Sequence, residues 1–370
     1  MRPTVLEVNL TQLKKNLENI RAHVAPAKVL VVLKANAYGH GVDGVAPFIA
    51  PFADYIGVAL VEEAIHLREI GIAIPILVMG GTLPEQLPYF FEYDLTLAAS
   101  SLDLLIAAEQ LAASTRKPLK VHLKIDTGME RIGVREYEAE PFIEKTLACS
   151  HLDVEGIFTH FANSETADDK LSDLGKVKAS LQLERFEEVL SIYEKRSAPT
   201  PRIRHTANSG ATLLLPQSHY DMVRPGVLFY GVYPGRDIEK TIDVKPALTW
   251  KSKVSYSKIT QPGRGVSYGS LWQAESAARI ATIPCGYADG YFRRMTNQAR
   301  VLINGKSYPQ VGRICMDQFM VNTGEDDVKV GDEVILLGAG ITAEDFADWT
   351  GTNEYEVMTN ISARVPRVFI

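Results

Sequence analysis

Lys34 is the residue in this sequence whose setting most directly suggests covalent chemistry. It follows five apolar residues, Val29–Leu33, and precedes Ala-Asn-Ala-Tyr38-Gly-His40-Gly. Burial disfavours the charged form of a lysine, so its pKa falls and its amine becomes nucleophilic. A nucleophilic amine is what Schiff-base chemistry requires. Lys34 therefore predicts such chemistry, and the alternative is a lysine that simply leaves a strand into solvent.

A second segment is suited to holding an anion. Asn208-Ser209-Gly210 precede Ala-Thr-Leu-Leu-Leu, which is typical of the start of a helix, and Arg224-Pro-Gly226 follow further along the chain. Backbone N–H groups and hydroxyls at a helix start bind anions. The alternative is a plain helix N-cap at Asn208 or Ser209. A reactive lysine together with a phosphate-binding turn is the combination expected for pyridoxal phosphate (PLP).

Arg224 would give such a cofactor a distinctive environment. It ends a predicted strand, and an arginine is effectively always protonated. Facing the pyridine nitrogen, Arg224 could not keep that nitrogen protonated as a carboxylate does. The ring would then be a weaker electron sink, and a long-lived quinonoid would be disfavoured. The alternative is an ion pair between Arg224 and Asp221 or another carboxylate.

Three histidines and two tyrosines complete the set of candidate groups. His122, His160 and His205 lie near predicted strand ends, without a tight spacing typical of metal ligands. They predict relay or core roles, and we predict no metal site. Tyr268 and Tyr287 lie in glycine-containing turns. On their own, such tyrosines are typical of amphipathic surface or interface positions.

The elements that must position these groups alternate between short apolar runs and helical segments. The runs cover 28–34, 54–60, 74–80, 94–99, 119–125, 154–160, 202–206 and 220–226. Intervening helical patterns cover 61–70, 100–114 and 172–195. Continuous apolar runs indicate parallel strands buried on both faces, so the pattern predicts an α/β fold with a (β/α)8 TIM-like barrel. A doubly wound sheet is the alternative, but no G-x-G-x-x-G follows the first run.

The pattern changes from about residue 240, where polar–apolar alternation replaces helical periodicity. The alternating runs are 248–259, 278–288, 299–322 and 332–338. Asn304-Gly305 between extended runs predicts a hairpin. We therefore expect a mainly antiparallel β domain after the barrel. The expected boundaries are 1–10 for an N-terminal strand that joins the β domain, 11–236 for the barrel and 237–370 for the β domain.

Composition limits the class of protein. The chain has 370 residues with 39 Lys and Arg against 45 Asp and Glu, a net charge of −6, which argues against a nucleic-acid partner. It has no apolar run of about 18 residues for a membrane span, and its start lacks the apolar core of a signal peptide. Three scattered cysteines do not make a disulfide framework. We expect a cytoplasmic enzyme.

Taken together, eight ordered segments resemble the alanine racemases, a family of PLP enzymes with a barrel and a β domain. The match runs nearly end to end. The segments are VVLKANAYGHG (31–41), HLKIDTGMERIG (122–133), GIFTHFA (156–162), HTANSGA (205–211), RPGVLFYG (224–231), GVSYG (265–269), GYADG (286–290) and GRICMDQ (312–318).

The resemblance implies a role for each candidate residue. Lys34 would form the internal aldimine and act as one base, and Tyr268 from the other subunit of a head-to-tail homodimer with shared active sites would be the second base. The phosphate would be held by Tyr38, Ser209, Gly226, Val227 and Tyr355, beside the Asn208 turn. Arg224 would face the pyridine nitrogen, and His160 would bridge Arg224 toward Tyr268. The substrate would meet Arg131, the backbone of Met316, Asp317 and Tyr287. Lys124 matches a position that is often N-carboxylated in the family, where the carbamate orients Arg131.

Two positions depart from the family pattern. Glu130 stands where the family often has glycine, and Ser362-Ala363 stand where a tyrosine often precedes Arg-Val-Pro-Arg. Neither position has an implied catalytic role.

The resemblance implies a two-base racemase that interconverts L-alanine and D-alanine, supplying D-alanine for peptidoglycan. Racemisation needs a proton removed from one face of Cα and another delivered to the opposite face, which two bases can do. One alternative is a broad-specificity racemase acting on serine or lysine. Another is a PLP barrel decarboxylase, which needs no second base like Tyr268. A non-enzymatic PLP carrier would need only the barrel.

Overall fold

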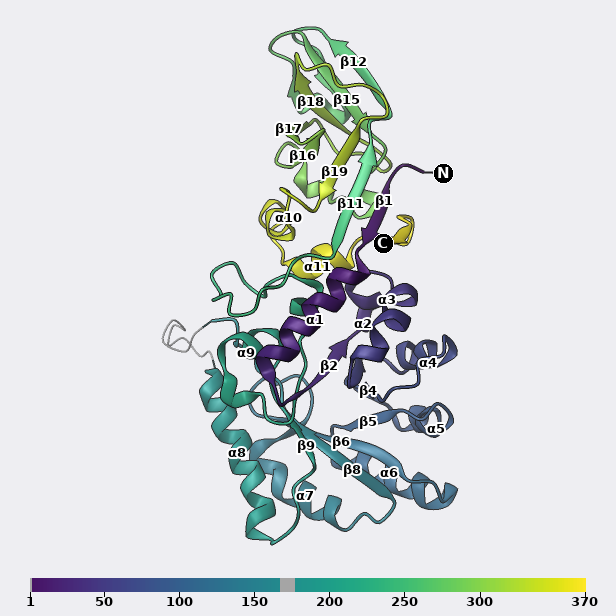
Figure 1. Ribbon diagram of the computed structural model, residues 1–370, viewed down its shortest axis with the longest axis vertical. Helices are drawn as coiled ribbons and strands as arrows, with labels where there is room; N and C mark the ends of the chain where they lie inside the picture. Colours follow the sequence, from purple (N-terminus) through teal and green to yellow (C-terminus); the bar gives the residue numbers. More distant parts are fainter. Residues whose placement is uncertain (1, 167–176) are drawn as a thin grey trace. The chain divides into compact units, whose positions relative to one another are not determined.

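The computed structural model in Figure 1 describes residues 2–166 and 177–370. The chain divides into two compact units. The barrel unit comprises Lys14–Ala37 and Val42–Val244. The β unit comprises Lys245–Ile370 with Tyr38–Gly41 and the residues up to Leu13. In the described part of the chain, no helix is both long and apolar enough to cross a membrane.

Eight parallel strands form the barrel, in the order β10-β2-β3-β4-β5-β6-β8-β9. All eight runs predicted from the sequence contain a strand. The strands are β2 (Lys28–Val32), β3 (Tyr55–Val58), β4 (Ile76–Val78), β5 (Thr96–Ala99), β6 (Leu119–Asp126), β8 (Leu152–Phe158), β9 (Ile203–His205) and β10 (Met222–Val223). A short strand, β7 (Val134–Arg135), pairs with β6. Between β9 and β10, backbone N–H groups of Asp221 and Arg224 donate to the carbonyls of Arg204 (3.0 Å) and Ala207 (2.9 Å) and nearly complete the ring.

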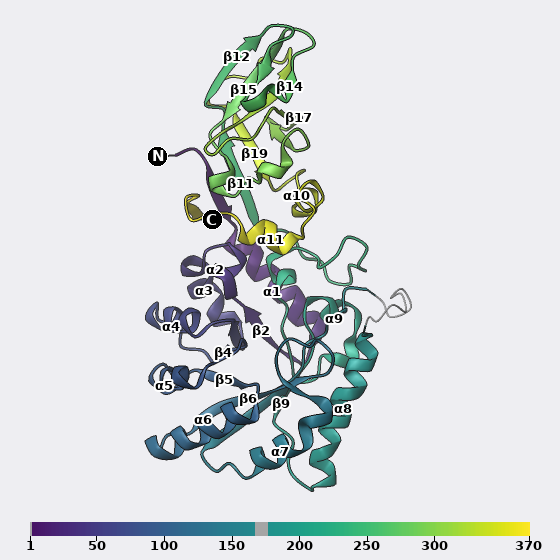
Figure 2. The ribbon, with the colours of Figure 1, turned by 180° about the vertical axis from the view of Figure 1, so that it is seen from behind.

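Helices lie between the barrel strands, as the predicted alternation requires. They are α3 (Val42–Ile49), α4 (Val61–Glu69), α5 (Leu87–Glu92), α6 (Leu102–Thr115), α7 (Ala139–Leu147), α8 (Ala179–Lys195) and α9 (Ser209–Leu214), and α1 (Leu10–Val24) precedes the first strand. In Figures 1 and 2, α4, α5 and α6 follow one another along the outside of the strands. Helix α8 buries Phe186, Val189 and Tyr193, a spacing that places them on one face. Residues 172–176 of the expected helix 172–195 lie outside the described residues.

The β unit contains a nine-stranded sheet in the order β12-β15-β18-β17-β16-β19-β11-β1-β20. All of its neighbouring pairs are antiparallel except β1 with β20, so the mainly antiparallel β domain is confirmed. Its strands are β1 (Val5–Val8), β11 (Leu248–Lys253), β12 (Tyr256–Thr260), β15 (Ala278–Ile283), β16 (Arg300–Ile303), β17 (Lys306–Val311), β18 (Phe319–Gly324), β19 (Glu333–Leu337) and β20 (Arg367–Phe369). A separate hairpin joins β13 (Gly265–Val266) to β14 (Trp272–Gln273), and the helices are α10 (Ala343–Thr350) and α11 (Glu354–Thr359).

The predicted hairpin at Asn304-Gly305 is present between β16 and β17. Both residues have positive φ, +50° and +80°, as a two-residue hairpin turn requires. The long run predicted over 299–322 contains three strands, and the segment 312–318 forms a loop between β17 and β18. Around this sheet, Trp250, Tyr291 and Phe346 pack into the apolar core.

Candidate active site

Lys34 begins a left-handed turn, labelled α2 (Lys34–Tyr38), directly after barrel strand β2. Ala35, Asn36, Ala37 and Tyr38 have φ between +50° and +54°, a conformation that costs a residue with a side chain about 1–2 kcal/mol. The carboxylate of Glu63 accepts the Ala35 N–H at 2.6 Å and holds the start of the turn. Strain maintained in this way is typical of functional sites.

The environment of Lys34 favours its neutral form. Burial lowers its pKa, the charge of Arg131 lowers it further, and Glu63 acts in the opposite direction. A lysine with a lowered pKa has more of its amine free to act as a nucleophile or base near neutral pH. The Lys34 amine is therefore chemically suited to the role that the sequence suggests.

Arg224 is buried among carbonyl oxygens and imidazoles. Its Nη1 donates to Nδ1 and the carbonyl oxygen of His205, both at 2.8 Å. Its Nη2 donates to the carbonyl oxygens of Thr159 (2.7 Å) and Thr206 (3.1 Å) and approaches His160 Nδ1 at 3.3 Å. These bonds use both terminal nitrogens. Within the described residues they leave Nε without a hydrogen bond, so Nε is available for a ligand acceptor.

The alternative of an ion pair between Arg224 and Asp221 is wrong. Asp221 is instead paired with Arg204, with Nε 2.8 Å from Oδ2. Among residues 2–166 and 177–370, Arg224 makes no ion pair with a carboxylate. Burial lowers its pKa to about 9, so the guanidinium remains predominantly charged at neutral pH.

The arrangement around Arg224 also fixes the protonation of His160. Because an arginine only donates hydrogen bonds, His160 Nδ1 must be the acceptor. In its neutral form, His160 then carries its proton on Nε2. Burial and the charge of Arg224 both lower the pKa of His160, which keeps the ring neutral.

Asn208 caps α9, as the alternative reading of this segment proposed. Its Oδ1 accepts the Ala211 N–H at 3.1 Å and the Ser164 hydroxyl at 2.6 Å. The close packing of this turn requires Gly210, since a Cβ there would lie 2.6 Å from the Ser164 carbonyl oxygen.

Ser209 is positioned to donate a proton to an anion. Its buried Oγ accepts the backbone N–H groups of Gly226 (2.9 Å) and Leu228 (3.3 Å). A serine oxygen accepts two hydrogen bonds and donates one. The Ser209 proton is therefore the part of this hydroxyl left to serve a ligand. The N–H of Val227, which lies between these two donors, has no hydrogen bond within the described part of the chain. Together these groups form a cradle of donors that fits a phosphate.

Asp126 organises the loop that carries Arg131. Its carboxylate accepts four successive backbone N–H groups at 2.8–3.1 Å, those of Gly128, Met129, Glu130 and Arg131. Burial would raise the pKa of Asp126, but these four bonds outweigh it and lower the pKa. No role was predicted for Asp126 from the sequence. An aspartate at a strand end followed by Thr-Gly, which is typical of a side-chain-bonded turn, could have indicated it.

Glu130, which departs from the family pattern, and Lys124, which was singled out for carboxylation, both lie beside this loop. Glu130 has φ +51°, a left-handed conformation that glycine adopts without cost, and its carboxylate pairs with Arg135 at 3.0 Å. Lys124 is buried with its Nζ 4.7 Å from the centre of the Phe158 ring. Burial, followed by the charge of Arg224, lowers the pKa of Lys124 well below its ordinary value, which favours the neutral amine.

In the β unit, the loops 286–290 and 312–318 are bonded to each other. The N–H groups of Tyr287 and Ala288 donate to the carbonyls of Cys315 and Met316, both at 3.0 Å. Tyr287, Met316 and Asp317, all predicted to contact the substrate, are therefore brought together. The side chains of Tyr287 and Met316 are exposed, so these loops present them at the surface of this unit.

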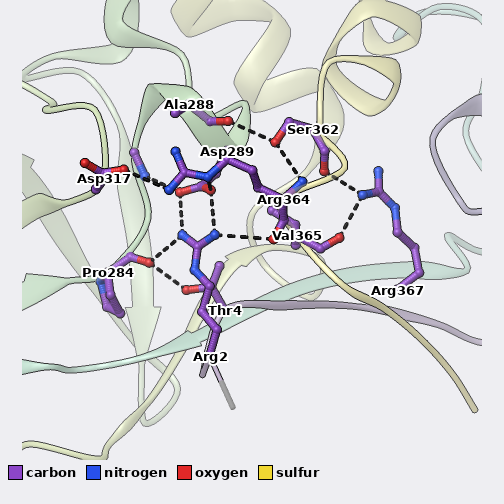
Figure 3. A network of polar contacts seen from close by, with 11 residues as sticks. Arg2, Thr4, Pro284, Ala288, Asp289, Asp317, Ser362, Arg364, Val365 and Arg367 are labelled. Carbon is purple, nitrogen blue, oxygen red and sulfur yellow. Dashed lines mark hydrogen bonds and ion pairs between the residues drawn. The ribbon is translucent and has the colours of Figure 1, made fainter.

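A charged network underlies these two loops (Figure 3). Asp289 is fully buried and accepts two bonds from Arg2, at 2.6 and 2.5 Å. Arg364 approaches Asp289 at 3.4 Å and pairs with Asp317 at 2.8 Å. The network joins residues near both ends of the chain to the loop of Tyr287. None of Arg2, Asp289 or Arg364 was predicted from the sequence.

Tyr268 lies in a turn bonded to the same loop region. It begins the 3-10 helix η7 (Tyr268–Ser270), and its side chain is 71% exposed. The preceding Ser267 donates to the Arg313 carbonyl at 2.6 Å and lies 3.3 Å from Cys315 Sγ. This turn therefore lies beside the segment that leads to Met316.

Tyr38 and Tyr355 are also neighbours within the β unit. Their ring centres are 6.1 Å apart, and Tyr355 lies on α11. Burial raises the pKa of Tyr38, so its hydroxyl stays protonated and can donate. The predicted residues therefore form two groups. The barrel unit contains Lys34, Lys124, Arg131, His160, Asn208, Ser209, Arg224, Gly226 and Val227. The β unit contains Tyr38, Tyr268, Tyr287, Met316, Asp317 and Tyr355.

This fold and these two groups define a barrel enzyme with an amine nucleophile, an anion cradle and an accompanying β domain. Residues 8–234 match the family "Alanine racemase, N-terminal domain" and residues 247–369 match "Alanine racemase, C-terminal domain". A curated alanine racemase from Carboxydothermus hydrogenoformans is 44% identical over 100% of both chains. Another, from Halothermothrix orenii, is 40% identical over 100% of this chain and 97% of the relative.

Solved structures agree. The alanine racemase of Clostridium difficile 630 has a TM-score of 0.92 at 38% identity, covering 100% of this chain and 96% of that chain. That of Bartonella henselae, with covalently bound pyridoxal phosphate, has a TM-score of 0.89 at 27% identity over 100% of both chains. The chain belongs to the alanine racemase family, which is PLP-dependent. These matches do not favour the decarboxylase alternative.

Proposed function

We propose that this protein interconverts L-alanine and D-alanine with PLP as its cofactor. The observation that carries the proposal is a set of three groups in the barrel unit of this family's fold. They are Lys34 with its lowered pKa, the Nε of Arg224 that is available for a ligand acceptor, and the Ser209 hydroxyl that can donate its proton. The substrate assignment is supported by curated alanine racemases that are 38–44% identical over the whole chain.

The residues present fit the cofactor. Lys34 would hold its aldehyde carbon, and Arg224 Nε would face its ring nitrogen. The phosphate would be held by the Ser209 hydroxyl, the N–H group of Val227, Tyr38, Tyr355 and the Asn208 turn. Gly226, whose N–H is bonded to Ser209 Oγ, would lie beside it. When bound, the cofactor withdraws electrons from Cα of the amino acid and makes the Cα proton acidic.

The protein itself would move the proton. Lys34, with its lowered pKa, serves as the base on one face of Cα, and Tyr268 of the partner subunit serves on the other. A phenol is a weak base unless the phenolate is stabilised. His160, whose Nε2 carries the proton, would bridge Arg224 toward that tyrosine. A donated hydrogen bond and a nearby positive charge both favour a phenolate.

The substrate carboxylate would be held by Arg131 and the backbone N–H of Met316, with Asp317 and Tyr287 lining the pocket. We propose that Lys124 is N-carboxylated. A neutral amine can attack CO2, forming a C–N bond and releasing one proton to water, which leaves a carbamate anion. The carbamate can form an ion pair with Arg131, which a neutral amine cannot. A high-resolution map with a bare amine at Lys124 at neutral pH would overturn this assignment.

The wider assignments from the sequence remain proposals. We propose a head-to-tail homodimer with shared sites, a cytoplasmic location, and a role in supplying D-alanine for peptidoglycan. The proposed domain limits are 1–10 with 237–370 for the β domain and 11–236 for the barrel. Sedimentation and cell fractionation test the assembly and the location. Mixing Lys34→Ala with Tyr268→Ala subunits should restore some activity, because one of the two sites in a mixed dimer then holds both bases.

The substrate is tested by a chiral assay across alanine, serine, lysine and arginine. Alanine should be racemised fastest, with no release of CO2 from lysine. Faster turnover of serine or lysine would favour the broad-specificity alternative. Borohydride reduction should fix the cofactor to the peptide that contains Lys34, and recovery on another lysine would contradict the site.

A further inference from the structure

A chain of buried side chains continues from Arg224 into the interior of the barrel. Arg224 Nη1 lies 2.8 Å from His205 Nδ1, and His205 Nε2 lies 2.8 Å from His122 Nδ1. His122 Nε2 in turn lies 3.8 Å from Glu155 Oε2. His205, His122 and Glu155 come from β9, β6 and β8, Arg224 follows β10, and both histidines are completely buried.

While Arg224 donates to His205, the donors and acceptors of this chain run in one direction. Arg224 donates, so His205 Nδ1 accepts, and neutral His205 carries its proton on Nε2. That proton is donated to His122 Nδ1, so neutral His122 also carries its proton on Nε2. Burial lowers the pKa of both histidines, which keeps them neutral. The second proton is therefore on the nitrogen that lies 3.8 Å from Glu155 Oε2, too far for a hydrogen bond but close enough for the carboxylate charge to favour it.

Glu155 supplies the negative charge at the far end. The Tyr55 hydroxyl donates to its Oε2 at 2.8 Å, and Arg202 Nη2 lies 3.3 Å from its Oε1. Burial would raise the pKa of Glu155, but the contacts from His122 and Tyr55 and the charge of Arg202 hold it at about 2. Glu155 is therefore a carboxylate at neutral pH.

Packing holds both imidazole rings in this alignment. His205 stacks on Phe158 with ring centres 4.6 Å apart and an interplanar angle of 7°. Gly156 allows the His122 ring to lie against the strand, because a Cβ there would be 2.4 Å from His122 Nδ1. Both imidazole rings are thus fixed by direct contacts.

We propose that Glu155 is a positioning residue for Arg224, acting through the fixed tautomers of His122 and His205. This inference rests on the proposed function, in which Arg224 faces the ring of the cofactor. The carboxylate selects the His122 tautomer whose proton lies on Nε2. The opposite tautomer would place a proton on His122 Nδ1, against the proton of His205. His205 would then have to reverse as well and would lose its bond from Arg224 Nη1.

The variant Glu155→Gln tests this inference, with Asp153→Asn as its matched control. Both residues lie on β8 and both contact Arg202, but the structure places only Glu155 beside His122. A glutamine can present a hydrogen-bond donor to His122, so it no longer enforces one tautomer. Tyr55→Phe is a second variant, which removes a bond to Glu155 and leaves its charge.

The decisive readout is the imidazole 15N NMR spectrum of the histidine-labelled holoenzyme, assigned through His122→Gln and His205→Gln. Wild-type, Asp153→Asn and Tyr55→Phe proteins should show both rings protonated on Nε2 alone. Glu155→Gln should show a mixture of tautomers, an altered absorption spectrum of bound PLP and a loss of kcat on the order of tenfold, which is typical of supporting residues. KM should change less than kcat.

The outcomes separate this inference from the proposed function. Unchanged tautomers and kcat in Glu155→Gln, with a folded protein, would overturn the inference while racemisation stands. The predicted tautomers in a protein that racemises no amino acid would overturn the proposed function. A Glu155→Gln protein that fails to fold still leaves the wild-type spectrum decisive, because an Nδ1 proton on either ring contradicts the chain.

Discussion

The oxygen of Ser209 accepts a hydrogen bond from the backbone N–H of Gly226 at 2.9 Å, across two segments that follow adjacent strands of the barrel. This contact joins the turn after β9 to the turn after β10. It also commits the serine oxygen as an acceptor and leaves its proton for a ligand.

Removing this hydroxyl should weaken both the fold and the cofactor site. Ser209→Ala leaves the N–H groups of Gly226 and Leu228 without their acceptor, at a cost of about 1–3 kcal/mol for a buried unsatisfied group. PLP titration of the apoenzyme should show weaker binding, and urea denaturation should show lower stability. Ser191→Ala, on the exposed side of α8, should change neither quantity, and an unaltered PLP affinity in Ser209→Ala would contradict the cradle.

Asp126→Asn should displace Arg131 and raise KM for alanine more than it lowers kcat. An asparagine retains one acceptor oxygen, so it cannot accept all four backbone N–H groups that the carboxylate holds. The pKa of Asp126 is lowered on folding from its ordinary value of 3.8. Its contribution to stability is therefore present above that pH and is lost as the pH falls through the folded value.

Denaturation of wild-type and Asp126→Asn proteins over a pH series measures this contribution. The difference between their unfolding free energies should be largest near neutral pH and should shrink below about pH 4. A difference that stays constant over the whole series would show that the carboxylate charge is unimportant to the loop.

A glycine in the left-handed turn after Lys34 should stabilise the protein. Ala35→Gly relieves a strained φ of +53° and should raise stability by up to about 1 kcal/mol. The same change at Ala107, inside the right-handed helix α6, should lower stability by about 1 kcal/mol. Thermal denaturation compares the two variants, and destabilisation by Ala35→Gly would contradict the strain.

Asp289→Asn should loosen the two loops that carry Tyr287 and Asp317. It weakens the charge-assisted bonds to Arg2 and Arg364 at a cost of about 1–3 kcal/mol. KM for alanine should rise with the loss of stability. Asp326→Asn, which weakens contacts with Lys306 and the Tyr308 hydroxyl, should cost less stability than Asp289→Asn and leave KM unchanged. Equal effects of the two variants would contradict the role of the network.

Much of the barrel could be predicted because short continuous stretches of the sequence identify its strands. Runs such as Val29–Leu33 are apolar at every position, which is what strands covered on both faces require. The Asn304-Gly305 turn was predictable for a similar reason, since its two residues by themselves favour the required positive φ values.

The supporting residues of the site could not be found in this way. Asp289 accepts its bonds from Arg2, 287 positions away in the chain, and no local pattern marks such a pair. Glu155 and Asp153 stand two positions apart on the same strand, and nothing in the sequence distinguishes them until the fold places His122 beside Glu155. The alternative of an Arg224–Asp221 ion pair is wrong because the fold places Arg204 against Asp221, although Arg224 is the nearer arginine in the sequence.

The central claim is that two bases act from opposite faces of Cα, and hydrogen exchange in Tyr268→Ala tests it most directly. The variant should bind PLP through Lys34 and still exchange the Cα hydrogen of D-alanine with deuterated solvent. Exchange of L-alanine should fall by far more, about 10²–10⁴-fold, which is the usual contribution of a general base. Equal loss of exchange for both enantiomers would contradict the two-base account.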